Sequence, residues 1–292
     1  MRASLPGKSR VNNKNSKKIT IYITGFTSDI GQCILKRLNH NKFKVVALVR
    51  NIKIAKKLKN RSGIIYRKFD LNKPLEKVNI DPNSILIHCA WENPRNVYSE
   101  NHIDSVMPQH YTFIEKMVKK GVEKVIVIGT CAEFGITYGP VKANDETSPC
   151  TSYGSGKDFL HKSLRFLEKD NNFELIWLRI FNIYGESIDK NTVTSLFSKA
   201  INDGLPDFPM SFGNQTFDYL LADDVAKRII NSLNKGSGIY HVCSAKPIKL
   251  KNLLTKIKKE KNSSIELKLG RYPYRNHEPI AIWGEHDDLR IL

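Results

Sequence analysis

The sequence predicts an α/β protein built on a doubly wound parallel sheet with a smaller C-terminal lobe. Three observations predict this class. Short apolar, β-rich runs alternate with helical stretches over the first two-thirds of the chain, the first run ends in a glycine-containing turn, and beyond about residue 183 prolines and glycines separate shorter elements. The apolar runs are continuous rather than alternating, as strands buried on both faces of a sheet require.

The expected strands, in chain order, are residues 19–25, 44–49, 64–69, 84–90, 124–130 and 174–180. Helices are expected from the first turn to about residue 38, over 51–59 and over 104–120. This alternation of strand and helix produces right-handed crossovers and helices on both faces of the sheet. We therefore expect a flexible basic tail at 1–16, a sheet domain at 17–182 and a lobe at 183–292, with elements near 217–245 returning to the sheet domain.

Composition excludes several classes of protein. The net charge is +18, but the lysines are dispersed over predicted helices without interleaved aromatic residues, which favours solvated faces over a nucleic-acid partner. No apolar run approaches the roughly 20 residues that span a bilayer, so no membrane association is expected. The five cysteines are scattered without metal-ligand spacing. We expect no disulfide, no metal and a cytoplasmic location.

The turn after the first strand is typical of a dinucleotide-binding loop. It reads Thr-Gly-Phe-Thr-Ser-Asp-Ile-Gly over residues 24–31 and opens a helix, so backbone N–H groups and the helix N-terminus can face a pyrophosphate. Ser28 stands where the backbone usually approaches the phosphates most closely, which weakens the prediction of tight binding. The cofactor residues predicted from this turn are Gly25, Thr27, Ser28, Asp29, Ile30 and Gly31.

The ends of the next strands predict the kind of cofactor. NAD-binding proteins place an acid after the second strand for the ribose 2′-hydroxyl, whereas this chain has Arg50, whose guanidinium can pair with a 2′-phosphate. NADP(H) is therefore favoured over NAD(H). Asp70, with Leu71 beside it, is expected to accept from the adenine amino group, and Ala90 and Trp91 are expected to lie along the cofactor.

Tyr153 and Lys157 are the predicted acid/base pair. Their i, i+4 spacing places both on one face of a helix, where the ammonium lowers the pKa of the phenol and also holds the nicotinamide ribose. Both residues therefore count among the cofactor-binding residues as well. Thr130 ends the fifth strand, and its hydroxyl is expected to bind the substrate oxygen that Tyr153 protonates.

These motifs occur in the order and spacing of a known family. The stretches are TGFTSDIG, GTCAEFG, YGSGK, LRIFNIYG and FGNQTFDYLLADDVA. With them the chain resembles the NAD-dependent epimerase/dehydratase family, extended short-chain dehydrogenases with a Rossmann-type NAD(P)-binding domain that modify nucleotide sugars. The resemblance implies a sugar-nucleotide substrate and a homodimer paired through the Tyr153 helix. It implies catalysis by Thr130, Tyr153 and Lys157, and substrate contacts from Thr130, Cys131, Asn182 and Arg275.

The same resemblance narrows the reaction. The 4,6-dehydratases carry an Asp-Glu pair after the catalytic threonine, where this chain has Cys131 and Ala132, so dehydration is not expected. The missing acid after the second strand favours an NADPH-dependent C4-ketone reductase of deoxysugar synthesis. A 4-epimerase with tightly bound NAD is the alternative. A non-catalytic NAD(P)-binding regulator also stays open. Ser28 and Phe217, the latter in place of a diphosphate-binding arginine, favour it, and the intact catalytic set argues against it.

Overall fold

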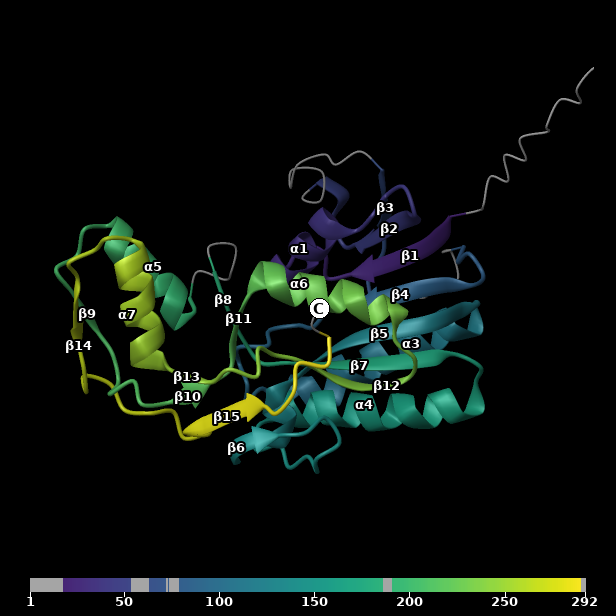
Figure 1. Ribbon diagram of the computed structural model, residues 1–292. Helices are drawn as coiled ribbons and strands as arrows, with labels where there is room; N and C mark the ends of the chain where they lie inside the picture. Colours follow the sequence, from purple (N-terminus) through teal and green to yellow (C-terminus); the bar gives the residue numbers. More distant parts are fainter. Residues whose placement is uncertain (1–17, 54–62, 72, 74–78, 186–190, 290–292) are drawn as a thin grey trace, which may run out of the picture.

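A single parallel sheet forms the centre of the molecule in the computed structural model, which describes residues 18–53, 63–71, 73, 79–185 and 191–289 (Figure 1). Its seven strands have the order β12-β7-β5-β4-β1-β2-β3, and every neighbouring pair is parallel. The strands are β1 (Ile19–Thr24), β2 (Phe43–Val49), β3 (Ile64–Lys68), β4 (Ser84–His88), β5 (Val122–Thr130), β7 (Glu174–Ile180) and β12 (Gly238–Val242). This arrangement confirms the predicted doubly wound fold.

Helices cover both faces of the sheet. On one face α1 (Asp29–Arg37) packs beside α6 (Ala222–Asn231), which continues into a 3₁₀ turn (Ser232–Asn234). On the other face a π-helical turn (His102–Val106) leads into α3 (Met107–Lys119), which packs against α4 (Ser152–Asp170). The apolar strand residues therefore face a helix layer on either side, which explains why their runs are continuous rather than alternating.

The strand order reverses between β1 and β4. From β1 the chain adds β2 and β3 on one side, and β4, β5, β7 and β12 extend the sheet on the other. Thr24, the last residue of β1, lies opposite His88, the last residue of β4. The carboxyl ends on either side of such a reversal flank a crevice where ligands bind.

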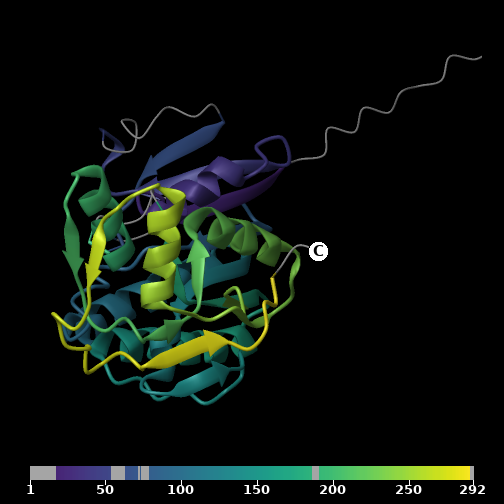
Figure 2. The same ribbon diagram turned by 60° about the vertical axis from the view of Figure 1, so that its left-hand side comes forward.

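The C-terminal lobe stands at this carboxyl edge. Its helices are α5 (Val193–Asn202) and α7 (Leu250–Glu260), its short strands β9 (Asp207–Pro209) and β14 (Glu266–Lys268) are parallel, and these elements share one apolar core. Figure 2, in which the lobe comes forward, shows the yellow-green helix α7 above the yellow strand β15.

Smaller sheets join the lobe to the sheet domain. One has the order β13-β10-β15-β6, and the other pairs β8 with β11. Their strands are β6 (Tyr138–Val141), β8 (Asn182–Tyr184), β10 (Thr216–Phe217), β11 (Tyr219–Leu221), β13 (Ile248–Lys249) and β15 (Ala281–Gly284). Because α6 and β12 follow α5 and β9 in the chain, the polypeptide passes from the lobe back to the large sheet before it completes the lobe.

The expected tail at 1–16 lies outside the described residues, as does most of the helix expected over 51–59. No helix in the described part of the chain combines the length and the apolar character needed to cross a membrane.

Candidate active site

The turn between β1 and α1 forms the cofactor side of the site. Gly25 has a φ of 66°, and a Cβ atom there would lie 2.5 Å from the backbone nitrogen of Ala90, so only glycine allows this turn to pack against the β4 loop. Ser28 caps α1: its Oγ accepts from the Gly31 N–H at 3.2 Å and donates to the Gly25 carbonyl at 2.7 Å. The Ser28 hydroxyl is thus bonded within the turn and occupies the Gly31 N–H, while the N-terminus of α1 still lies at the carboxyl edge of the sheet.

The other predicted cofactor residues gather along the same edge of the sheet. Arg50 directly follows β2, and its side chain, 71% exposed, donates to Glu92 at 2.9 Å. A tight turn, a helix N-terminus and the ends of adjacent strands fit a dinucleotide. The remaining predicted residues lie in the turn (Thr27), in the first turn of α1 (Asp29, Ile30, Gly31), after β3 (Asp70, Leu71) and after β4 (Ala90, Trp91).

The predicted catalytic residues meet at one corner. Thr130 is the last residue of β5, and Tyr153 and Lys157 lie in the first turns of α4, which Thr151 caps through the Gly154 N–H. The Thr130 hydroxyl lies close enough to the phenol of Tyr153 to lower the pKa of that phenol. Lys157 is 2% exposed, and its Nζ donates to the carbonyl of Ile128 at 2.7 Å.

Burial sets the protonation of this pair. It raises the pKa of Tyr153, and the hydrogen bond with Thr130 opposes that rise. Burial lowers the pKa of Lys157 to about 7, because an ammonium is poorly solvated there. Near neutral pH the phenol of Tyr153 therefore holds its proton and can donate it, while Lys157 lies close to its titration point.

Trp91 contacts the catalytic pair directly. The Nζ of Lys157 lies 4.0 Å from the centroid of the Trp91 ring, and the ring of Tyr153 meets the indole edge-on at 6.2 Å. The indole N–H donates to Nδ1 of buried His102 at 3.2 Å, which fixes the plane of the ring. An aromatic face at this distance attracts an ammonium ion.

A pair of buried histidines lies behind Trp91. Nε2 of His88 and Nδ1 of His110 are 2.6 Å apart, and Nδ1 of His88 lies 2.9 Å from the hydroxyl of Thr24. The His110 ring lies 4.8 Å from that of Trp91. Burial lowers the pKa of His110 to about 3 and that of His88 well below its usual value, so both rings are neutral and add no charge behind Lys157.

A cleft of about 960 Å³ separates this corner from the C-terminal lobe. It is lined by Tyr153 and by three of the predicted substrate residues: Cys131, Asn182 and Arg275. Thr130, the fourth, is 9% exposed and lies outside the lining. Burial raises the pKa of the Cys131 thiol to about 12, so it stays protonated and offers neither a nucleophile nor a base.

Two lining residues concern the diphosphate. Arg275 is 69% exposed and pairs with Glu278 at 2.9 Å. Phe217, at the position of the missing arginine, is 7% exposed and packs into an apolar cluster with Phe134 and Phe181. Arg275 is thus the predicted phosphate ligand on the lobe side of the cleft. Phe217 packs in the apolar core and offers no charge to a diphosphate.

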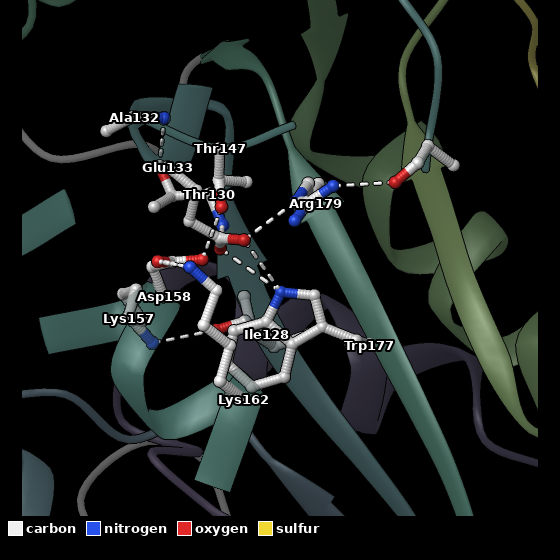
Figure 3. A network of polar contacts seen from close by, with 11 residues as sticks. Ile128, Thr130, Ala132, Glu133, Thr147, Lys157, Asp158, Lys162, Trp177 and Arg179 are labelled. Carbon is white, nitrogen blue, oxygen red and sulfur yellow. Dashed lines mark hydrogen bonds and ion pairs between the residues drawn. The ribbon is translucent and has the colours of Figure 1, made fainter. Parts of the chain in front are cut away.

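Within the described part of the chain, one grouping has the spacing of metal ligands: atoms of Glu133, Asp158 and His161 lie within 4.8 Å of one another. Each carboxylate is already paired with a cation, Glu133 with Arg179 at 2.7 Å and Asp158 with Lys162 at 2.6 Å. Figure 3 shows both pairs side by side. We assign the grouping to this ion-pair network rather than to a metal.

Comparison with known proteins identifies the family. The sequence profile of the NAD dependent epimerase/dehydratase family matches residues 21–243. The chain belongs to this family. The family's Rossmann-type fold and its NAD-dependent oxidoreductase and epimerase chemistry on nucleotide sugars therefore apply to it.

Two relatives of the chain are named for reactions of deoxysugar nucleotides. The chain is 29% identical over 269 residues to a dTDP-6-deoxy-L-talose 4-dehydrogenase (NAD(+)) of Aggregatibacter actinomycetemcomitans, which covers 91% of this chain and 99% of the relative. It is 30% identical over 154 residues to a dTDP-4-dehydro-6-deoxyglucose reductase of Escherichia coli, covering 50% of this chain and 48% of that one.

A similar solved structure is a UDP-N-acetylglucosamine 4-epimerase from Methanobrevibacter ruminantium M1 in complex with UDP-N-acetylmuramic acid. Its TM-score is 0.78 and its identity 22%, over 92% of this chain and 89% of that one. At this identity the likeness shows the shared fold.

Sequence reasoning missed the groups that surround the catalytic corner. Glu133 carried a usable signal, because Thr-x-x-Glu is the pattern of a capping box, and Thr130 and Glu133 form one over the 3₁₀ turn (Cys131–Phe134). Trp91 was predicted as a cofactor contact, but no local pattern indicated its position over Lys157. Nor did any pattern indicate the pairing of His88 with His110, which come from different elements.

Proposed function

We propose that the chain reduces the C4 ketone of a nucleotide-linked 4-keto-6-deoxyhexose. The observation that carries the proposal is the phenol of Tyr153 in the lining of the cleft, beside positions Cys131 and Ala132 that bear only a thiol and a methyl group. This arrangement supports proton donation to one oxygen and lacks the acid and base that dehydration requires at those positions. The two relatives named above, a 4-dehydrogenase and a 4-dehydro-sugar reductase, support the same carbon and the same redox change.

Each catalytic residue then has a defined task. A nicotinamide cofactor bound at the carboxyl edge would supply the hydride that forms the new C4–H bond. Thr130 orients the carbonyl oxygen, and Tyr153 transfers its proton to that oxygen as the C=O bond becomes C–OH. The ammonium of Lys157 stabilises the phenolate that Tyr153 leaves, until solvent returns the proton.

The cofactor proposed is NADP(H) in preference to NAD(H). Support comes from Arg50 after β2, whose guanidinium can take a 2′-phosphate as a bidentate partner. Glu92 opposes this, because it already pairs with Arg50, but an exposed pair of this kind contributes at most about 1 kcal/mol and can exchange partners. The talose 4-dehydrogenase is named for NAD(+), so measured cofactor preference is the test.

We further propose a homodimer paired through α4 and a cytoplasmic place in deoxysugar or surface-polysaccharide synthesis. Phe159 and Phe166 lie about two helical turns apart on α4 and are 44% and 67% exposed. Exposed aromatic side chains on one helix face are typical of an interface. Sedimentation of the wild type and of Phe166→Glu tests this, and a monomeric wild type would refute it.

The deciding experiment follows oxidation of NADPH and NADH with CDP-, dTDP- and GDP-linked 4-keto-6-deoxyhexoses. Oxidation of the cofactor that requires Tyr153 supports the reductase, and the ketosugar that is reduced identifies the nucleotide base of the substrate. If none is oxidised, but the purified protein carries NAD and interconverts C4 epimers, the same catalytic set serves a 4-epimerase. If neither reaction occurs, the proposal of a 4-keto-6-deoxyhexose reductase is refuted.

A further inference from the structure

Glu133 is a buried carboxylate directly beneath the catalytic corner. It is 0% exposed, and both of its oxygens are fully engaged. Oε1 accepts the backbone N–H of Thr130 at 2.8 Å, Oε2 accepts Nε of Arg179 at 2.7 Å, and the indole N–H of Trp177 lies 3.1 Å from each oxygen (Figure 3). A carboxylate held at four points is a rigid anchor for whatever it contacts.

One of those contacts constrains a catalytic residue. The N–H of Thr130 is held by Glu133, and Oγ of Thr130 accepts the N–H of Ala132 at 3.2 Å. The hydroxyl of Thr130 also lies close enough to the phenol of Tyr153 to oppose the rise in the pKa of that phenol. The backbone contact therefore holds the Thr130 hydroxyl where both the phenol and a substrate oxygen can be reached.

Gly129 makes room for this arrangement. A Cβ atom at residue 129 would lie 2.3 Å from Nε1 of Trp177 and 2.7 Å from Oε1 of Glu133. Any side chain there would displace the carboxylate or the indole. The Gly-Thr pair at the end of β5 thus lets Glu133 reach the Thr130 backbone.

Arg179 allows the carboxylate to remain charged in this position. It is 2% exposed, donates from Nη1 to the Ala143 carbonyl at 2.6 Å, and lies 4.6 Å from the ring centroid of Phe134. A buried ion pair costs desolvation and often stabilises a fold no better than apolar residues of the same size. Fold stability alone therefore does not explain the Glu133–Arg179 pair, whereas the positioning of Thr130 by Glu133 does.

We propose that Glu133 is a positioning residue for the catalytic Thr130, holding its backbone so that the hydroxyl faces the phenol of Tyr153. The inference rests on the proposed function insofar as Thr130 acts in catalysis. Glu133 itself touches no substrate, because it does not line the cleft.

The test isolates the acceptor at residue 133 from the ion pair. In Glu133→Gln/Arg179→Met the amide oxygen still accepts the Thr130 N–H, and in Glu133→Met/Arg179→Met no acceptor remains. Neither variant leaves a buried charge unpaired, so both are expected to fold. Each is also made with Thr130→Val, which removes the hydroxyl and completes a double-mutant cycle.

We expect the change from Gln to Met at residue 133 to lower kcat about tenfold with KM nearly unchanged when Thr130 is present, and less than about twofold with Thr130→Val. Equal losses in both backgrounds would mean that Glu133 acts only through general stability, which overturns the proposal. Amide hydrogen exchange of residues 129–134 gives a readout independent of turnover. Faster exchange there in the Met variant alone, with β7 unchanged, supports the contact, and equal exchange in both variants refutes it. A wild type that turns over no ketosugar refutes the proposed function instead, and the exchange result still decides the contact.

Discussion

The two walls of the cleft differ in how their functional groups are held. Directly behind the sheet-domain wall, Thr130 and Lys157 are 9% and 2% exposed, and each has contacts that fix it in the protein alone. On the lobe wall the side chain of Arg275 is 69% exposed and Tyr272 is 58% exposed. The proposed catalytic groups are thus held by buried contacts, whereas the groups proposed to face the nucleotide are exposed to water. Changes in the first wall should alter kcat and its pH dependence, and changes in the second should alter KM.

The largest effect is expected from Tyr153→Phe. Removing the proton donor should lower kcat about 10²–10⁴-fold, while the ring volume and the fold are kept. Cofactor oxidation with the best ketosugar measures it. Tyr272→Phe on the opposite wall is the matched control and should leave kcat unchanged. Residual activity above about a tenth in Tyr153→Phe would move the proton donor to another group.

Trp91→Leu tests the pH dependence of the buried wall. The aromatic face favours the ammonium form of Lys157, whose pKa burial has already lowered to about 7. Without the ring that pKa should fall further, so the charged form is lost at lower pH. The alkaline limb of the kcat profile should therefore move to lower pH.

Trp91→Phe is the conservative comparison for this shift. It keeps an aromatic face over Lys157 and loses the N–H donated to His102, so its limb should move less. If both variants moved the limb equally, orientation by His102 rather than the attraction of the ring for the ammonium would be responsible.

The parts of this site that the sequence predicted are those encoded by local spacing. Tyr153 and Lys157 are separated by one helical turn. Thr130 ends β5 and Gly25 directly follows β1, and the apolar runs of both strands are continuous, so position along the chain already placed these residues at one edge of the sheet. Fold class and catalytic corner both follow from such patterns.

The parts that the sequence did not predict depend on pairing between distant elements. Glu133, in the 3₁₀ turn after β5, meets Arg179 of β7, 46 residues further along the chain. Trp91 reaches Lys157 through a loop whose path no periodicity describes. Side-chain direction in such loops is decided by tertiary packing, which a single sequence does not display.

On the lobe wall, Arg275→Ala should raise the KM for the nucleotide sugar about tenfold and leave kcat nearly unchanged, because the lost charge-assisted contact is to a part of the substrate that does not react. Steady-state kinetics measure the split. Glu278→Gln frees the same guanidinium from its partner and should lower KM slightly. A fall in kcat for Arg275→Ala would show that this wall also orients the sugar at C4.

The smallest effect is expected at Arg50. This residue tests whether the exposure of a side chain or the domain it belongs to decides its kinetic effect. Arg50 belongs to the sheet domain, yet its side chain is 71% exposed and its pair with Glu92 is screened by water. Arg50→Ala should lower kcat/KM for NADPH a few-fold and leave that for NADH unchanged, while Glu92→Gln should move the ratio the other way. Both ratios come from initial rates with each cofactor at saturating ketosugar. If Arg50→Ala instead lowered kcat with both cofactors, residues of the sheet domain would affect kcat whether they are buried or exposed. A change confined to the cofactor ratio would mean that burial, rather than the domain a residue belongs to, decides which kinetic constant it controls.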